Sequence, residues 1–213
     1  MENQVKWSTD RATLARGIAL VKRSGCTARQ RIWMAWEKVM LWIMGLNSEG
    51  KIDAGMCKVI VKKYKGPSFD CEDGTRIEQG DLVGELHLNN QMILGLTREA
   101  GAGRAALQTA RLARTSLKEI SAALDKRPEL TRVKALLGVT LLHRGLTHGL
   151  GFEQRRLPSK RFERITAVYL KLLLFFLHPD GLERSDRCKE KLTPIMLVCT
   201  RSNLLRRFSP DNK

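Results

Sequence analysis

The sequence lacks the cysteine patterns that mark disulfide frameworks and zinc sites. Its cysteines are odd in number and scattered, with no C-x-x-C pair and no histidine at zinc-ligand spacing. They are Cys26, Cys57, Cys71, Cys188 and Cys199. We therefore expect reduced thiols and no metal site.

Motifs for common enzyme chemistries are also missing. The sequence has no G-x-x-x-x-G-K-[ST], G-x-G-x-x-G, G-x-S-x-G or H-E-x-x-H, so phosphate-loop, dinucleotide-binding, esterase and zinc-protease functions have no support. No motif in the sequence indicates which cofactor, if any, the protein binds. A weak anion-binding signal is Gly101-Ala102-Gly103, just before a predicted helix rich in arginine, although a plain loop explains it as well.

We expect neither an export leader nor a membrane-spanning segment. The start, Met-Glu-Asn-Gln, has no charged-then-apolar leader with a small-residue cleavage site. We therefore expect a cytoplasmic location. The apolar stretch over 31–46 is interrupted by Glu37 and Lys38, so it falls short of the roughly 20 apolar residues that a spanning helix needs.

The same stretch, 31–46, predicts a helix with a glycine stop at Gly45. Two interpretations of its three tryptophans stay open. The helix packs against a sheet, as apolar stripes usually do, or it makes a peripheral membrane contact, since tryptophan rings favour the bilayer interface. The tryptophans are Trp33, Trp36 and Trp42.

Negative charge is scarce relative to positive charge. Lysine and arginine outnumber aspartate and glutamate by 38 to 22, a formal net charge of +16. Such a field favours anionic partners: nucleic acid, an anionic membrane, or a phosphorylated or carboxylated small molecule. A solvated basic surface without a partner is the alternative. Nucleic acid is disfavoured, because no binding motif is present and only 6% of the residues are aromatic.

The order of helical and strand patterns predicts a single α+β domain, with a mixed sheet of about five strands packed with three to four helices. It extends over 31–213, after a basic N-terminal arm at 1–30. Helices are expected over 31–46, 104–124, 162–178 and 202–208, the last with Ser202 as a candidate N-cap. Strands are expected over 56–64, 82–88, 136–143, 152–157 and 195–200, with a hairpin turn at Asp73-Gly74.

Polar side chains share one face of the strand that ends in ELHLN. Period-two alternation places Glu85, His87 and Asn89 together and turns the neighbouring leucines toward the core. A carboxylate, an imidazole and an amide suit acid–base chemistry or polar recognition. One histidine and one glutamate do not define a metal site. A polar strand face without function is the other interpretation.

Further candidates for ligand binding flank this strand. Asp81 and Asn90 lie on the turns at its two ends, and Arg144 or Arg98 is a candidate cation for an anion site. The sequence does not reveal which of these residues are neighbours in the fold.

Several segments carry a resemblance to the YkoP-like domain family. They are VKKYKGPSFDCEDGTRIEQGDLVGELHLNN around 59–90, LLGVTLLHRG at 136–145 and LGFEQRRL at 150–157. The resemblance extends from about Trp33 to Phe208. Its ordered motifs include Tyr64-Lys65-Gly66, Asp73-Gly74, Gly80-Asp81, Leu86-His87, Asn89 and Gly151-Phe152-Glu153.

The resemblance indicates where family members occur, but not which reaction or ligand they have. Family members look like stand-alone proteins of sporulating bacteria or appendages of polysaccharide deacetylases. Together with the net charge and the polar face of Glu85, His87 and Asn89, the resemblance predicts an auxiliary binding domain in cell-envelope or sporulation-related glycan metabolism. We expect that face to bind an anionic glycan precursor, lipid head group or phosphate, or an envelope-enzyme partner. The alternative is a transferase or hydrolase on an envelope precursor, with His87 as general base and Glu85 orienting it.

Overall fold

The structure is a computed structural model. It describes residues 31–33, 35–36, 38–39, 42, 48–140, 149–177 and 194–208. The predicted basic arm over 1–30 lies outside these residues, so its existence stays a prediction.

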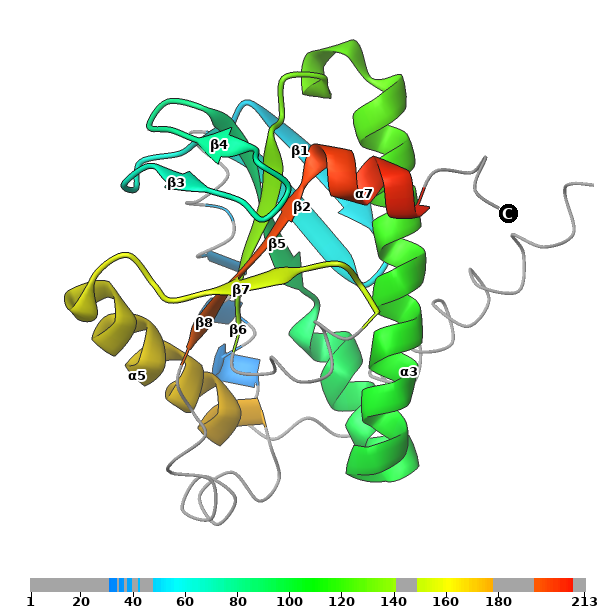
Figure 1. The fold of residues 1–213 in the computed structure, drawn as a ribbon. Helices are drawn as coiled ribbons and strands as arrows, with labels where there is room; N and C mark the ends of the chain where they lie inside the picture. The colour runs from blue at the N-terminus through cyan, green and yellow to red at the C-terminus, as the bar shows by residue number, and fades with distance from the viewer. Residues whose placement is uncertain are drawn as a thin grey trace, which may run out of the picture.

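A six-stranded sheet forms the centre of the fold, in the order β1-β2-β5-β6-β8-β7 (Figure 1). Only β5 and β6 pair in parallel, and every other pair in this sheet is antiparallel. The sheet strands are β1 Gly50–Ala54, β2 Cys57–Lys63, β5 Leu82–Leu88, β6 Ala135–Thr140, β7 Glu153–Arg155 and β8 Ile195–Thr200. The predicted α+β class and mixed sheet are confirmed.

The sheet has one strand more than expected, because β1 was not predicted. It pairs with β2 through a tight turn at Gly55, whose φ of 55° lies in the left-handed region. Its sequence, GKIDA, is short and contains glycine and aspartate, both depleted in strands. Pairing with β2 therefore outweighs its weak local preference.

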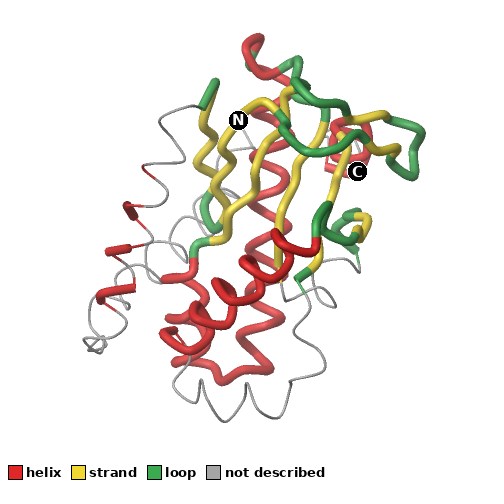
Figure 2. The backbone as a smooth tube through the Cα atoms, turned by 90° about the vertical axis from the view of Figure 1, so that its left-hand side faces the viewer, coloured by secondary structure: helices red, strands yellow, loops and turns green. Residues whose placement is uncertain are grey.

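Helices lie on both sides of the sheet. The described residues between 31 and 42 are helical. Further elements are α3 Asn90–Lys126, the short 3-10 helix η1 Pro128–Leu130, α5 Lys160–Leu177 and α7 Arg201–Phe208. Figure 2 looks at the sheet with α3 behind the strands, and α5, on the left of Figure 1, lies on the near side.

The long helix α3 corrects two predictions. It begins at Asn90 rather than at 104, because Asn89 accepts the Met92 backbone N–H through Oδ1 at 3.2 Å, as an N-cap does. Gly101-Ala102-Gly103 therefore lie inside the helix and not at its N-terminus. The proposed anion site at these glycines was wrong, since helix-interior N–H groups are already bonded.

Two apolar clusters lie on opposite faces of the sheet. The larger one packs α3 and α7 against the strands and includes Leu117, Ile120, Leu136, Leu197 and Leu204, all less than 5% exposed. The smaller one, on the other face, includes Tyr64, Ile77, Val83 and Val198. The sheet is therefore buried on both sides along its middle strands, and polar groups there need explanation.

A second, two-stranded sheet covers one end of the smaller cluster. It consists of β3 Phe69–Asp70 and β4 Arg76–Ile77, joined by a turn in which Gly74 has a φ of 84°. This confirms the hairpin predicted at Asp73-Gly74. We call residues 69–77 the hairpin.

Asp73 ties the hairpin to the start of α7. Its Oδ2 accepts hydrogen bonds from the Thr200 hydroxyl at 2.5 Å and the Ser202 hydroxyl at 2.6 Å. Thr200 also accepts the Asn203 backbone N–H at 3.2 Å, so Thr200 is the N-cap and the expectation for Ser202 was wrong. Burial alone would raise the pKa of Asp73, but the bonds from Ser202, Thr200 and Thr75 hold it well below its usual range.

We predict that Asp73→Ala lowers the free energy of unfolding by about 1–2 kcal/mol at pH 7, a modest value because the carboxylate is exposed. Its folded pKa is depressed, so its contribution is present above the unfolded value of about 3.9 and fades as pH falls below it. Urea denaturation at pH 7 and near pH 3 measures this.

Asp53→Ala is the matched control for Asp73→Ala. It removes an exposed carboxylate whose described ion pair is with Lys58, at 3.2 Å, and should cost less than about 0.5 kcal/mol. Equal effects of the two substitutions at pH 7 would contradict the anchoring role of Asp73.

Candidate functional sites

The structure places Glu85 and His87 on the same face of β5. In the antiparallel register with β2, Glu85 lies opposite Ile60 and His87 opposite Lys58. Lys62 is a diagonal neighbour of Glu85 on that face, within reach of a long side chain. The pair therefore stands beside the smaller apolar cluster, with a lysine on one side.

Glu85 and His87 are close but not hydrogen-bonded. Lys62 Nζ is 2.5 Å from Glu85 Oε1. His87 Nε2 is 3.8 Å from Glu85 Oε2, too far for a hydrogen bond. Among the residues that the structure describes, neither of these two buried atoms has a hydrogen-bond partner. Such atoms are uncommon in proteins and often mark a functional group or a bound water or ion.

Burial lowers the pKa of His87, with a further lowering from Lys62, while Glu85 opposes both. His87 is therefore neutral at pH 7. A neutral imidazole next to a carboxylate that is already paired with Lys62 can accept a proton, but adds no positive charge for holding an anion. The hypothesis, drawn from the sequence, that His87 acts as a general base stays a prediction.

Asn89 and Asn90 mark the start of α3 rather than a continuation of β5. Asn89 caps α3, and its backbone N–H donates to the Met56 carbonyl at 2.8 Å. Asn90 is the first residue of α3. The side chain of Arg98 and the whole of Arg144 lie outside the described residues. A ligand-binding role for these four residues stays a prediction.

Asp81 lies at the opposite end of β5 from His87. Six residues separate them along an extended strand, about 20 Å at roughly 3.3 Å per residue. Asp81 Oδ2 accepts the Glu78 backbone N–H at 2.7 Å and lies 2.8 Å from Lys134 Nζ. Burial alone would raise the pKa of Asp81, but Lys134 and the Glu78 N–H lower it. Asp81 therefore belongs to a different site.

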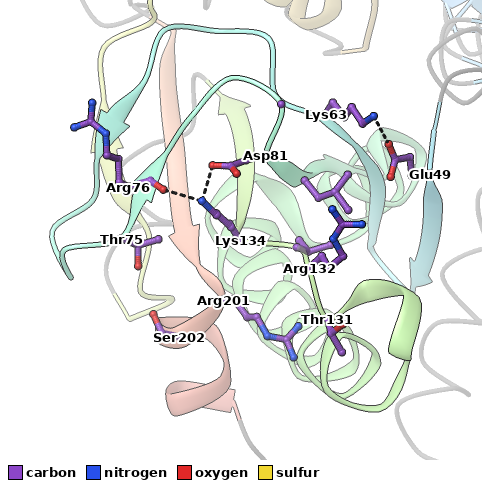
Figure 3. Close-up of a pocket in the computed structure, with 13 residues that line it drawn as sticks. Glu49, Lys63, Thr75, Arg76, Asp81, Thr131, Arg132, Lys134, Arg201 and Ser202 are labelled. Atoms are coloured by element: carbon purple, nitrogen blue, oxygen red, sulfur yellow. Dashed lines mark hydrogen bonds and ion pairs between the residues drawn. The ribbon is translucent and has the colours of Figure 1, made fainter.

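That second site is a cleft of about 880 Å³ at the edge where β5 and β6 begin (Figure 3). We call it the basic cleft. Five cationic side chains and two carboxylates line it, together with three hydroxyls. Its lining residues are Glu49, Lys63, Thr75, Arg76, Gly80, Asp81, Leu82, Thr131, Arg132, Val133, Lys134, Arg201 and Ser202.

Strand direction explains why these residues meet. β5 and β6 run parallel, so their first residues lie at one edge. β2 is antiparallel to β5, and β8 is antiparallel to β6, so both of those strands end at the same edge. Lys63, Lys134 and Arg201 therefore converge from distant parts of the chain, and the hairpin adds Arg76.

Three of the cations have structural partners. Arg201 donates to the carbonyls of Leu124 at 2.8 Å and Leu130 at 3.2 Å, which closes the ends of α3 and η1. Lys134 pairs with Asp81 and donates to the Arg76 carbonyl at 3.4 Å. Arg76 pairs with two carboxylates of the hairpin region, those of Asp70 and Glu78. These contacts fix the positions of the three side chains, and carboxylates offset the charges of Lys134 and Arg76.

The remaining two cations are available to a ligand. Lys63 Nζ lies 3.6 Å from Glu49 Oε1, and both side chains are exposed. Within the part of the chain that the structure describes, no ion pair or hydrogen bond engages the Arg132 side chain. Figure 3 shows Lys63 and Arg132 on the same side of the cleft, across from Arg76.

No cluster of three or more histidine, cysteine, aspartate or glutamate residues suited to a metal is found among the described residues. Cys57, Cys71 and Cys199 are free and buried, as expected for reduced thiols. Burial raises the pKa of each to about 12. They are therefore protonated at pH 7 and poor nucleophiles or metal ligands.

Comparison with known proteins gives the family. A family model described as the YkoP domain matches residues 27–208. The chain belongs to the YkoP domain family. It is 24% identical over 123 residues to the uncharacterized protein YkoP of Bacillus subtilis (strain 168), a match that covers 57% of this chain and 67% of that protein. No solved structure matches.

The family assignment confirms the resemblance drawn from the sequence motifs. Two of the residues on which that resemblance was based have visible roles in the structure. Asp73 anchors the hairpin on α7, and Asp81 fixes Lys134 in the basic cleft. Sequence analysis missed the cleft itself, because its cations lie singly at the ends of strands. Their only local signal is polar residues flanking apolar runs, as in Thr131-Arg132-Val133-Lys134.

We predict that His87→Leu is at least as stable as the unaltered protein at pH 7, because it removes a buried nitrogen that has no partner. The folded pKa of His87 is lowered, so protonation favours unfolding. The free energy of unfolding of the unaltered protein should therefore decrease as the pH drops below about 6.5. This group contributes at most about 1.4 kcal/mol per pH unit to the decrease.

Thermal melts of both proteins between pH 5 and 8 provide the measurement. The variant should show a shallower decline at acidic pH. An identical pH dependence in both proteins would mean that His87 is not held neutral by the fold.

Proposed function

We propose that this YkoP-family protein is an auxiliary binding domain of cell-envelope or sporulation-related glycan metabolism, and that its basic cleft binds an anionic glycan precursor. Five cations converge on this cleft, and two of them, Arg132 and Arg201, have no carboxylate partner among the described residues, which supports this proposal. Excess fixed positive charge in a concave site attracts phosphate or carboxylate groups. A cytoplasmic location, where nucleotide-activated sugars are made, is part of the proposal.

The cleft offers both charge and hydrogen-bond donors. Arg132 presents a planar guanidinium suited to a bidentate contact with a phosphate or carboxylate. Lys63 supplies a flexible point charge from the adjacent strand end. The hydroxyls of Thr75 and Thr131 line the same space, and such groups can bind the neutral part of a ligand or its phosphate oxygens.

The basic cleft suits an anion better than the β5 face does. On that face the Lys62 and Glu85 charges cancel, and His87 is neutral. In the cleft, Glu49, Asp81 and the Asp70 and Glu78 partners of Arg76 offset three of the five positive charges, and among the described residues Arg132 and Arg201 have no carboxylate partner. The proposal therefore keeps the anionic ligand expected from the composition and moves its site about 20 Å along β5.

An acid–base role for Glu85 and His87 is a separate candidate, favoured by their two buried atoms without hydrogen-bond partners. This alternative requires a reacting group to reach His87 Nε2. Both side chains are a little over a quarter exposed, but the Nε2 and Oε2 atoms themselves are buried, so this face must open locally to admit such a group. It predicts a chemically accessible histidine, whereas a structural role predicts a protected one.

We predict that the double variant Lys63→Glu with Arg132→Glu weakens binding of a uridine diphosphate sugar by about ten-fold or more. The loss of two charge-assisted contacts accounts for this size. Isothermal titration calorimetry measures the affinity, with the uncharged parent sugar as ligand control. Binding of the unaltered protein should also weaken steeply as salt is raised, because exposed charges are screened.

Lys51→Glu with Lys58→Glu is the matched control, because it makes the same charge change on exposed β1 and β2 positions outside the cleft. It should reduce affinity far less than the cleft variant. Equal losses of affinity in both variants would mean that the net charge of the protein, and not the cleft, accounts for binding. Salt-independent binding, or equal binding of the neutral sugar, would count against it.

For the acid–base alternative, we predict that diethylpyrocarbonate acylates His87 in the folded protein at pH 7, at a rate within about ten-fold of an unfolded peptide with the same sequence. Neutral imidazole is the reactive form, so the lowered pKa permits reaction. Peptide mass spectrometry locates the adduct. Complete protection of His87 while the peptide reacts would remove this residue as a catalytic base.

A further inference from the structure

Large exposed apolar side chains gather on two helical segments. Among the described residues, seven of the nine such side chains belong to the segment 31–42 and to α5. We call them the two-helix surface: Ile32, Trp36, Val39 and Trp42 on the first segment, and Ile165, Val168 and Leu172 on α5. Trp42 is 65% exposed and Ile165 is 69% exposed.

Helical spacing aligns these side chains into two stripes. On each segment they recur three or four residues apart, which places them on one face of a helix. The two segments are neighbours, because the rings of Trp33 and Tyr169 lie with centroids 5.5 Å apart. Trp33 is buried, while Trp36 and Trp42 are exposed. The segment therefore uses one side to pack and leaves the other side open.

Positive charge accompanies the apolar stripes. The α5 sequence contains four cations and a single acid, Glu163. The described cations on α5 and on the first segment are exposed: Arg31, Lys38, Lys160, Arg161, Arg164 and Lys171. Exposed tryptophan and aliphatic side chains with flanking lysine and arginine are the pattern of a peripheral helix in the interface of an anionic bilayer.

We propose that the two-helix surface docks on an anionic lipid bilayer, with the apolar side chains in the headgroup region and the cations against lipid phosphates. No described helix is long and apolar enough to cross the membrane, so the contact lies in the interface plane. A phosphate backbone or a row of acidic side chains would satisfy the cations but would offer little apolar area to the tryptophan and aliphatic side chains. The sequence suggested this contact for Trp33, Trp36 and Trp42. Trp33 is buried and takes no part in it, while α5 enlarges the surface.

The test is sedimentation of the full chain with vesicles of phosphatidylcholine alone or mixed with phosphatidylglycerol. The unaltered protein should bind the mixed vesicles and bind the neutral ones much less. Trp36→Ser with Trp42→Ser, and separately Ile165→Ser with Val168→Ser, should each reduce partitioning about ten-fold or more. Because these side chains are exposed, circular dichroism should show both variants folded.

Leu107→Ser is the matched control, since Leu107 is 57% exposed on α3 and is not part of the two-helix surface. It should partition like the unaltered protein. An equal loss in this control, or no preference for anionic vesicles, would overturn the proposal. It would also fail if sedimentation equilibrium showed a dimer that the tryptophan variant dissolves, because the surface would then be occupied by a second copy of the chain.

Discussion

The parallel pairing of β5 with β6 is the constraint on which the rest of the structure depends. Two parallel neighbours need a long crossover, and α3 supplies it while covering one face of the sheet. The same pairing brings the starts of both strands to one edge, where Lys134 meets Asp81 at 2.8 Å. The antiparallel partners β2 and β8 must then end at that edge. The basic cleft is therefore a consequence of sheet topology.

The hairpin adds residues to the basic cleft from the face of the sheet that α3 does not cover. Asp73 holds it against the N-cap of α7, and Glu153 Oε2 accepts the Glu72 backbone N–H at 2.8 Å from the side of β7. These contacts position Thr75 and Arg76 over the strand ends. Docking of a two-stranded element on a six-stranded sheet thus gives the cleft its second wall. Asp73-Gly74, Gly80-Asp81 and Glu153, on which the resemblance to the family was based, all contribute to this one region.

Local patterns were sufficient for most elements and insufficient for the site. The apolar run at 195–200 matched β8, and Asp73-Gly74 matched the hairpin turn, because alternation and turn chemistry act over a few residues. β1 and the first part of α3 were not predicted. β1 forms because it pairs with β2, and the Asn89 cap sets where α3 begins. Alternation also placed Glu85 and His87 on one face. The cleft stayed hidden because Lys63, Arg132 and Arg201 are brought together only by strand order, to which one sequence gives no access.

The central claim is that an anionic ligand binds at the edge where β5 begins and not at Glu85 and His87. A ¹⁵N NMR titration with a uridine diphosphate sugar tests this most directly, because each backbone amide reports on its own surroundings. The account predicts that the largest shifts fall on Thr75, Thr131, Arg132 and Lys134, with little change at Glu85 and His87. Shifts centred on Glu85 and His87, with the cleft residues unmoved, would contradict it.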